Sequence, residues 1–375
     1  MTVLGFARVV TPGGVLDPGW VETAGGRISA VGTGQPPHGV DMDLGGQWLV
    51  PGFVDMHVHG GDGASFATGD ADDARRVAEF HRRHGTTTLV ASLVSARLEI
   101  LERAVASLAE LVEDGLLAGV HLEGPFLSTA RCGAHDPAML RPPAQADVER
   151  LLRAGHGTVR MITLAPELAN GLDAVRAVVA HGAAAAIGHT DATYEVTRQA
   201  IEAGASVATH LFNGMRPVHH REPGPVLALL EDERITVELI CDGIHLDPAV
   251  VRATAQTVGL RRLALVTDAI AAAGVGDGTY VLGGLPVRVA GGAAHLADGT
   301  SIAGSTLTTS AALRNAVRAD IPVAEAVQAL SSTPATALGL HHRLGAIRTG
   351  LDADLVVLDT DLTVQHVMAK GAWIT

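Results

Sequence analysis

Short apolar runs alternate with amphipathic stretches through the middle of the chain. Eight runs read as buried strands, at 53–59, 87–94, 118–123, 159–166, 184–189, 206–211, 235–242 and 263–268. Helical periodicity fills the intervals, at 70–84, 97–114, 144–154, 167–181, 191–203, 222–232 and 247–259. Eight β/α alternations over roughly 250 residues are typical of a (β/α)8 barrel of the TIM type. An open doubly wound sheet is the alternative. The barrel is favoured because nearly every strand run ends in a polar residue, and a barrel brings those ends to one mouth.

The two ends of the chain share a second pattern, in which polar and apolar residues alternate between glycine-rich corners. It covers residues 1–50 and 344–375 and predicts a small β-sandwich domain built by both termini. The barrel domain would then span 51–343, and the fold class is α/β. Within the barrel domain, residues 277–300 read as a hairpin insertion after the eighth strand, followed by helices at 308–319 and 322–331. Asp191 and Asp247 are candidate N-caps of the helices that follow them.

Composition narrows the classes of function. The 375 residues are 47% apolar but only 3% aromatic, so an aliphatic core is expected. There are 27 basic and 40 acidic residues, and the net charge of −13 argues against nucleic acid and membranes as partners. Two cysteines, Cys132 and Cys241, cannot form a disulfide framework. Neither an export signal nor the 18 uninterrupted apolar residues of a membrane span is visible. A cytoplasmic location is therefore expected. Lys370 is the only lysine, which excludes Schiff-base and carboxylated-lysine chemistry, whereas 18 histidines direct attention to metals and proton transfer.

Metal-ligand side chains stand at the ends of the first and third predicted strands. The first strand ends in His57-Val58-His59, and residues two apart in a strand point to the same side. Both imidazoles are therefore expected at the barrel mouth, although two hydrogen-bonded polar histidines are the simpler interpretation of such a pair alone. The third strand ends in Glu123, and a carboxylate at the end of an apolar strand needs a metal or an arginine as its partner.

Three further strands end in groups of the same kind. His189 and His210 end strands five and six and lie 21 residues apart, which is one βα unit, so they should stand side by side at one height. Glutamate and two histidines with an open position for water are the pattern of a catalytic zinc site. Asp268 ends strand eight, where it could take a proton from water and return it to a leaving amine; a helix N-cap is the alternative role.

The loop after strand six, residues 216–224, concentrates arginine and histidine in an acidic chain. It indicates an anionic substrate group such as phosphate, with surface ion pairing as an equal alternative. Cys132 follows strand three and would be close to a metal, but no base surrounds it, which argues against a nucleophile.

Nine short motifs are spread along the whole chain. They are HVHG (57–60), HLEGPF (121–126), GHT (188–190), THLFNGM (209–215), HREPG (220–224), CDGIH (241–245), VTDA (266–269), GSTLT (304–308) and the closing segment from Gly345 to Val356. Together they resemble the N-acetylglucosamine-6-phosphate deacetylases of the amidohydrolase superfamily. The resemblance implies a barrel with a small β-sandwich from both chain ends. It also implies a metal-dependent hydrolase that releases acetate from N-acetyl-D-glucosamine 6-phosphate, in amino-sugar catabolism and cell-wall recycling.

The resemblance also implies a role for individual residues that match its motifs. The metal ligands would be Glu123, His189 and His210, joined by His57 and His59 for a second metal. Asp268 would be the general base and then the acid, and His135 would hydrogen-bond the acetyl carbonyl. Substrate contacts would come from Ala134, Asn213, Gly214, Arg221, Asp242, His245, Ile302, Ala303 and Gly304. Arg221 would reach the neighbouring active site of a homodimer.

One or two divalent metals per subunit are implied, with zinc the first choice and iron, cobalt or manganese compatible with the same ligands. Because His57 and His59 are present and the barrel has no lysine, Glu123 is the evident bridge of a binuclear site. The expected partner is a phosphorylated amino sugar. N-acetylgalactosamine-6-phosphate deacetylase, another amidohydrolase acting on a cyclic amide or dipeptide, and a catalytically silent scaffold stay open as alternatives.

Overall fold

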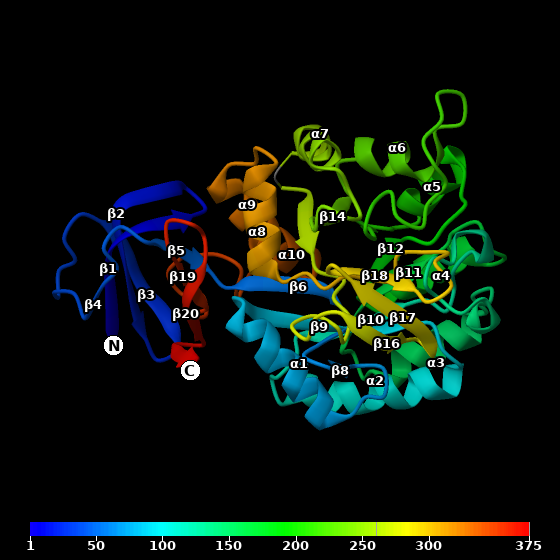
Figure 1. The fold of residues 1–375 in the computed structure, drawn as a ribbon, viewed down its shortest axis with the longest axis horizontal. Helices are drawn as coiled ribbons and strands as arrows, with labels where there is room; N and C mark the ends of the chain where they lie inside the picture. Colours follow the sequence, from blue (N-terminus) through cyan, green and yellow to red (C-terminus); the bar gives the residue numbers. More distant parts are fainter. Residues whose placement is uncertain (260, 375) are drawn as a thin grey trace.

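The computed structural model describes residues 1–259 and 261–374. Figure 1 shows a barrel of strands surrounded by helices, beside a second sheet that contains both chain termini. Leu260 and Thr375 belong to the predicted domains but lie outside the described residues. Within the described residues, no helix is both long and apolar enough to cross a membrane.

One of two eight-stranded sheets is a parallel barrel whose strands follow one another in chain order. They are β6 (Phe53–Val58), β9 (Thr86–Val94), β10 (Gly119–Glu123), β11 (Val159–Leu164), β12 (Ala184–Ile187), β13 (Val207–Ala208), β14 (Thr236–Ile240) and β15 (Leu263–Val266). Main-chain hydrogen bonds join the two ends of this sheet, from Asp268 N–H to the His57 carbonyl and from His59 N–H to the Ala269 carbonyl, both at 2.8 Å. The sheet thus closes, and the predicted (β/α)8 fold class is confirmed.

Helices cover the outside of the barrel (Figure 1). They are α1 (Ala71–Arg83), α2 (Leu98–Glu113), α3 (Gln145–Ala154), α4 (Gly171–Ala180), α5 (Tyr194–Glu202), α6 (Gly224–Glu231), α7 (Pro248–Val258), α8 (Thr309–Arg318), α9 (Val323–Leu330) and α10 (Ser332–Ala337). Asp247 caps α7 by accepting from Ala249 N–H, as predicted. Thr193 rather than Asp191 caps α5, because the Asp191 carboxylate pairs with Arg131 and Arg216 instead.

The second eight-stranded sheet, which belongs to the smaller domain, joins the two chain ends. Its strands are β1 (Thr2–Thr11), β2 (Gly14–Ala24), β3 (Arg27–Thr33), β4 (Met42–Asp43), β5 (Trp48–Pro51), β19 (Leu355–Leu358), β20 (Val364–Ala369) and β21 (Ala372–Ile374). The antiparallel pairing of β5 with β19 links the halves. This sheet has its own hydrophobic cluster, around Leu4, Leu49 and Leu355. We propose the predicted division at 50/51 and 343/344, with β5 extending one residue beyond the first boundary.

The segment after β15 forms more than the predicted hairpin. Three antiparallel strands, β16 (Gly278–Leu282), β17 (Leu285–Ala290) and β18 (Ala293–Leu296), make a small sheet. It packs Leu282 and Val287 against Val94 and Ile270, which lie at the barrel mouth. Two short strands, β7 (Gly60–Gly61) and β8 (Ala64–Ser65), follow β6. The β16–β18 insertion, through Leu282 and Val287, therefore forms one wall of the barrel mouth.

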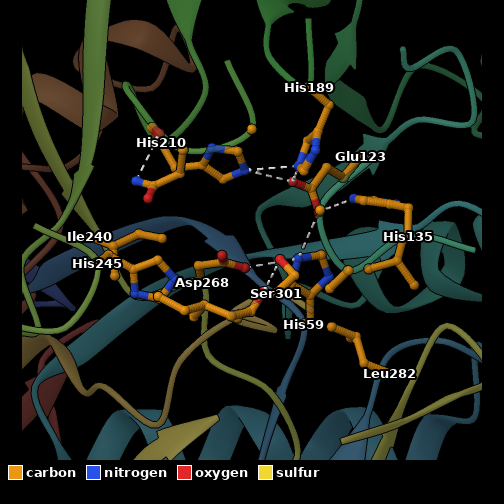
Figure 2. A pocket seen from close by; sticks show the side chains of 17 residues that line it. His59, Glu123, His135, His189, His210, Ile240, His245, Asp268, Leu282 and Ser301 are labelled. Carbon is orange, nitrogen blue, oxygen red and sulfur yellow. Dashed lines mark hydrogen bonds and ion pairs between the residues drawn. The ribbon is translucent and has the colours of Figure 1, made fainter. Parts of the chain in front are cut away.

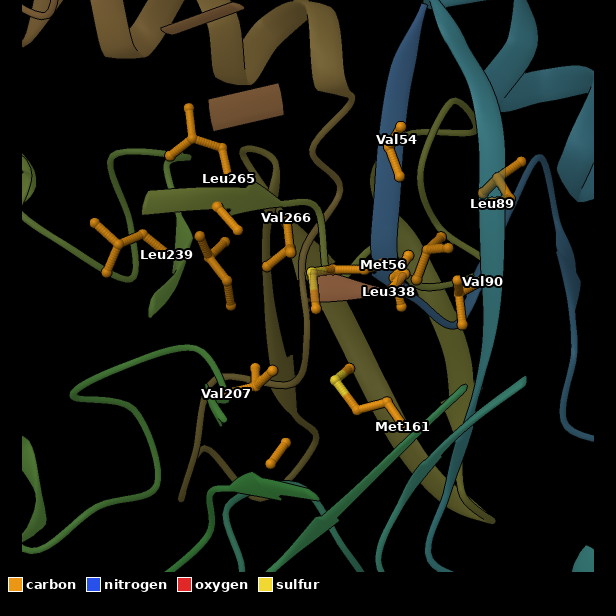
Figure 3. Close-up of a cluster of buried hydrophobic side chains, with 14 of the residues drawn as sticks. Val54, Met56, Leu89, Val90, Met161, Val207, Leu239, Leu265, Val266 and Leu338 are labelled. Carbon is orange, nitrogen blue, oxygen red and sulfur yellow. The ribbon is translucent and has the colours of Figure 1, made fainter. Parts of the chain in front are cut away.

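The alternation of side chains in the barrel strands separates an apolar layer from a polar interior. Val54 and Met56 of β6 lie in the aliphatic cluster with Val266 and Leu338 (Figure 3). Asp55 and His57, which alternate with them along the strand, face the barrel interior, where Asp55 hydrogen-bonds Thr267. Polar side chains such as Asp55 and His57 therefore share the barrel interior with apolar ones such as Ile240.

Candidate active site

A pocket of about 180 Å³ opens at the carboxyl ends of the barrel strands. Figure 2 shows histidines and two carboxylates converging there from different strands. Twelve predicted site residues line it: His59, Glu123, Ala134, His135, His189, His210, Asn213, Gly214, His245, Asp268, Ile302 and Gly304. The five that stand at strand ends, His59, Glu123, His189, His210 and Asp268, therefore meet in space with seven that the resemblance implied.

Glu123 lies at the centre of the pocket floor and offers one oxygen to each of two ligand sets. Its Oε1 is 3.1 Å from His189 Nε2 and 2.9 Å from His210 Nε2, and those two nitrogens are 3.1 Å apart. Its Oε2 is 3.1 Å from His59 Nε2 and 3.6 Å from His57 Nε2. No arginine pairs with Glu123 among the described residues, so the alternative of an arginine partner fails. Each set has the spacing needed to hold one metal ion.

The backbone bends where several of these side chains leave their strands. His189, His210 and Asp268 adopt positive φ angles of 46°, 27° and 49°. L residues rarely adopt this conformation, and residues held there cluster at functional sites. Each follows the last residue of its strand by one or two positions, so the bend directs the side chain across the mouth instead of along it.

In these histidine rings Nε2 faces Glu123 and Nδ1, the outer nitrogen, points away from it. The partner of Nδ1 determines whether Nε2 can offer a lone pair to a metal. His189 Nδ1 lies 2.9 Å from the Arg131 carbonyl and His59 Nδ1 lies 3.1 Å from the Ser92 carbonyl. A carbonyl only accepts, so both Nδ1 atoms donate, and in the neutral form that binds a metal each ring turns a lone pair on Nε2 toward Glu123. Metal-ligating histidines have this arrangement, with the outer N–H on a carbonyl or carboxylate. The lone pairs face a carboxylate at contact distance, and a cation between them makes that arrangement favourable.

Burial and charge act in opposite directions on the pKa values of the floor. Burial alone would lower the pKa of His57 and His59, but Glu123 and Asp268 outweigh it: the pKa of His57 is well above its usual range and that of His59 is raised to about 9. Burial would raise the pKa of Glu123, yet His57 and His135 hold it well below its usual range. The floor therefore favours positive charge beside Glu123, which protons or a divalent cation can supply.

Asp268 completes the floor. Burial would raise its pKa, but His57 and His59 lower it to about 2, so the group is ionised. Its Oδ1 lies 3.2 Å from His59 Nε2 and 3.6 Å from His57 Nε2. No described helix begins at Asp268, so it is not an N-cap. An ionised carboxylate at the pocket surface beside a candidate metal is placed to accept a proton.

His135 faces Glu123 from the loop after β10. Burial lowers its pKa to about 4, so the ring is neutral. Its Nδ1 accepts from Ser95 N–H at 3.3 Å, which leaves the proton on Nε2, 3.4 Å from Glu123 Oε2. The ring therefore presents a hydrogen-bond donor to the pocket, as an amide carbonyl oxygen would require.

The opposite side of the pocket carries groups for a polar substrate. Asn213 and Gly214 follow β13. His245, labelled in Figure 2, comes from the loop after β14. A side chain at Gly214 would place its Cβ 2.8 Å from His189 Nδ1, and φ there is +59°, so only glycine fits beside this ligand.

Three predicted substrate contacts do not line the pocket. Asp242 lies behind His245, with its Oδ2 2.7 Å from His245 Nδ1, so it orients that ring. Ala303 is fully buried in the cluster that anchors the β16–β18 insertion. Arg221 is exposed on the loop after β13, and its guanidinium contacts none of the described residues at hydrogen-bond distance. In the same loop Arg216 pairs with Asp191 at 2.9 Å. Part of the positive charge of the loop is therefore neutralised by an ion pair, which is the alternative to phosphate binding given above.

Sequence reasoning missed residues that support the floor or close the pocket. Glu238 of β14, which no motif includes, contacts Nδ1 of His57, a predicted ligand that is completely buried. His121 bridges Ser92 and Thr163 below the floor. The signal available for Glu238 was a charged residue inside the apolar run of strand seven. Val94, Ile240, Leu282, Gly133 and Ser301 also line the pocket.

Comparison with known proteins agrees with this geometry. The amidohydrolase family model matches residues 48–374. The chain belongs to the amidohydrolase family. This amidohydrolase is 35% identical over 374 residues to an N-acetylgalactosamine-6-phosphate deacetylase of Escherichia coli O157:H7, with 98% of each chain covered. It is 38% identical over 347 residues to the N-acetylglucosamine-6-phosphate deacetylase of Bos taurus, with 88% of this chain and 84% of the relative covered.

The fold of this amidohydrolase also matches a solved relative with a bound substrate. N-acetyl-D-glucosamine-6-phosphate deacetylase from Mycobacterium smegmatis, as an aspartate-to-alanine variant in complex with N-acetyl-D-glucosamine 6-phosphate, superposes with a TM-score of 0.97. The two are 50% identical, and 100% of this chain and 99% of that chain are covered. The predicted resemblance is therefore confirmed, and so is the prediction that the chain is a hydrolase.

Proposed function

We propose that this amidohydrolase removes the acetyl group of N-acetyl-D-glucosamine 6-phosphate, yielding D-glucosamine 6-phosphate and acetate. The observation that carries the proposal is Glu123, which presents one oxygen to His189 and His210 and the other to His57 and His59, beside an ionised Asp268. The relatives named for this reaction, found at 34–38% identity, support the choice of substrate. A cytoplasmic place in amino-sugar catabolism and cell-wall recycling stays a prediction.

Two divalent cations fit the side chains of the floor. Glu123, His189 and His210 would hold one, and His57, His59 and Glu123 the other. Zinc is our first choice, and iron, cobalt or manganese suit the same donors. Bound there, the metal supplies Lewis acidity to the amide carbonyl and acidifies water.

The protein's own groups handle the protons and the carbonyl oxygen. Asp268 accepts the proton of the attacking water and then delivers it to the departing amine nitrogen. The Nε2–H of His135 donates to the amide oxygen, whose negative charge grows during attack. A neutral donor fixed by Ser95 N–H is ready before the substrate arrives.

The sugar phosphate would lie at the opposite side of the pocket. His245, oriented by Asp242, and the main-chain N–H of Gly214 are the donors there, whereas the main-chain N–H of Asn213 donates to the His210 carbonyl at 3.0 Å and would reach the phosphate as a shared donor. The guanidinium of Arg221 lies on an exposed loop and pairs with none of the described residues, which suits a phosphate contact in the neighbouring subunit of a homodimer. Ala134, Ile302 and Gly304 line the walls between the two ends, and the main chain of the buried Ala303 would complete the Ile302–Gly304 wall.

The galactosamine epimer is a second candidate substrate. It is favoured by the relative from Escherichia coli O157:H7, which is matched over 98% of both chains. The two sugars differ only at one hydroxyl, so the same floor chemistry would serve both. Rates on the two 6-phosphates, measured side by side, decide between them.

Acetate release from N-acetyl-D-glucosamine 6-phosphate, with and without a strong chelator, tests the proposal. We expect turnover that the chelator abolishes and added divalent metal restores, and much slower turnover of unphosphorylated N-acetylglucosamine. Undiminished turnover after verified removal of metal would contradict the metal assignment. Equal rates on the two sugars would contradict the phosphate assignment.

A further inference from the structure

Glu238 is a buried carboxylate that the proposed reaction does not use. It lies in the middle of β14, within the run Thr236–Ile240, and its side chain has no exposure to solvent. It does not line the pocket but lies below it, inside the barrel. No arginine or lysine among the described residues pairs with it.

Glu238 contacts one histidine from each ligand set. Its Oε2 lies 3.2 Å from His57 Nδ1, and the same oxygen accepts from the main-chain N–H of His210 at 3.2 Å. Its own carbonyl accepts from Leu211 N–H at 2.9 Å. One residue thus holds the ring of His57 from behind and fixes the backbone of His210 at the point where φ is 27°.

The contacts of Glu238 argue against a purely structural role. Its Oε1 is buried and has no hydrogen-bond partner among the described residues. Leaving such an atom unpartnered is costly, whereas an apolar side chain of similar size would avoid the cost. The carboxylate is therefore retained for what its other oxygen does.

The two ligand sets differ in the partners of their outer nitrogens. Nδ1 of His59 and of His189 faces a carbonyl, and Nδ1 of His210 has no partner among the described residues. Of the four rings, only His57 has a carboxylate on Nδ1. A carboxylate in this position orients a histidine ligand and raises its basicity toward the metal.

We propose that Glu238 is a positioning residue for both ligand sets and determines the affinity of the second cation, the one held by His57, His59 and Glu123. The inference rests on the proposed function, because it presupposes metal at Glu123. It adds that the Glu238 carboxylate, through His57, allows the second cation to bind. Binding of the first cation depends on Glu238 more weakly, through the His210 backbone.

Two substitutions separate the charge of Glu238 from its hydrogen bonds. Glu238→Gln can keep an oxygen at the Oε2 position and so retain both N–H contacts while removing the negative charge. Glu238→Leu removes both contacts. Asp354→Asn is the matched control, because Asp354 is another buried carboxyl that accepts a main-chain N–H, that of Lys370, but lies at the junction with the smaller domain.

The experiment titrates metal-free protein with Zn²⁺ against a chromophoric chelator and counts bound equivalents by elemental analysis. For Glu238→Gln we expect the second equivalent to bind about 10-fold more weakly, with the first within 2-fold of wild type, on the scale typical of outer partners of metal ligands. For Glu238→Leu we expect a loss of about 100-fold for the second equivalent and about 10-fold for the first. The control should bind both as wild type does.

The outcomes distinguish this inference from the function on which it rests. Wild-type protein that binds no cation would overturn the proposed metal site and the inference with it. Wild-type protein that binds two equivalents, with folded Glu238 variants that bind both as tightly, would overturn the inference alone. Equal weakening of both equivalents in Glu238→Gln would also overturn it. Thermal melting followed by circular dichroism checks folding, and if the leucine variant does not fold, the glutamine variant decides.

Discussion

The floor and the rim of the pocket are built in different ways. We define the floor as Glu123 and Asp268 with His57, His59, His189 and His210, and the rim as Asn213, Gly214 and His245 together with Arg221 on the exposed loop beside the pocket. Floor side chains are buried, and three of the four rings have an outer nitrogen fixed by a carbonyl or carboxylate. At the rim, His245 is fixed by Asp242, whereas Arg221 is exposed and unpaired among the described residues. Chemistry needs ligands positioned before the substrate arrives, whereas recognition of a phosphate can be completed by a side chain that moves.

Substitution at the centre of the floor should have the largest effect. Glu123→Ala removes a ligand from both sets, and the metal contributes several kcal/mol to stabilising the transition state. At 1.36 kcal/mol for each tenfold, acetate release should fall by about 10⁴-fold. Elemental analysis should find less than one metal equivalent. Glu102→Ala, an ion-paired carboxylate on the barrel exterior, is the control and should keep both properties. A variant that retains two equivalents and wild-type turnover would remove Glu123 from the centre of the site.

Asp268→Asn should separate catalysis from metal binding. The amide keeps the shape of the side chain but cannot accept and return a proton. We expect kcat to fall by roughly 10²–10⁴-fold, while the metal content stays at the wild-type value. Steady-state acetate release and elemental analysis on one preparation measure both. Near-normal turnover would show that another group carries the proton.

His81 tests how the floor is supported from behind. Its Nε2–H, on α1, donates to the carbonyl of Gly60, next to His59, at 2.9 Å. Burial lowers the pKa of His81 from 6.5 to about 4, so the neutral ring stabilises the fold fully above pH 6.5. That contribution is lost as the pH falls from 6.5 to 4, because the unfolded chain binds the proton first.

The size of this loss follows from the shift at 1.36 kcal/mol per pKa unit, about 3 kcal/mol. Urea unfolding at pH 7.5 and pH 4 should show wild type losing about 3 kcal/mol more stability than His81→Gln, which has no titrating ring. Equal losses in the two proteins would mean that His81 is not the buried neutral group described.

Arg221→Ala should have the smallest effect and should act on binding. Losing one charge-assisted contact to phosphate should raise KM for the 6-phosphate by about 10- to 100-fold, with a smaller change in kcat. Turnover of unphosphorylated N-acetylglucosamine should not change. If KM rises equally for both sugars, the arginine does not read the phosphate.

The floor was predictable because its signals are local. Ligand-type residues at strand ends, and the 21-residue spacing of His189 and His210, translate into adjacent strands through the regular barrel. The rest depends on contacts between distant segments. The sequence predicts Asp191 as a helix cap, but its carboxylate pairs with Arg216, and only the folded loop brings the two together. Glu238 lies in no motif, and its importance appears only when the closed barrel brings its side chain from β14 against His57 of β6 and against His210, which follows β13.

The most direct test is anomalous diffraction from crystals of the zinc-reconstituted enzyme, recorded on both sides of the zinc absorption edge. The account predicts two peaks on either side of the Glu123 carboxylate, one against His189 and His210 and the other against His57 and His59. No peak within coordination distance of Glu123, in crystals whose protein contains zinc by elemental analysis, would contradict it.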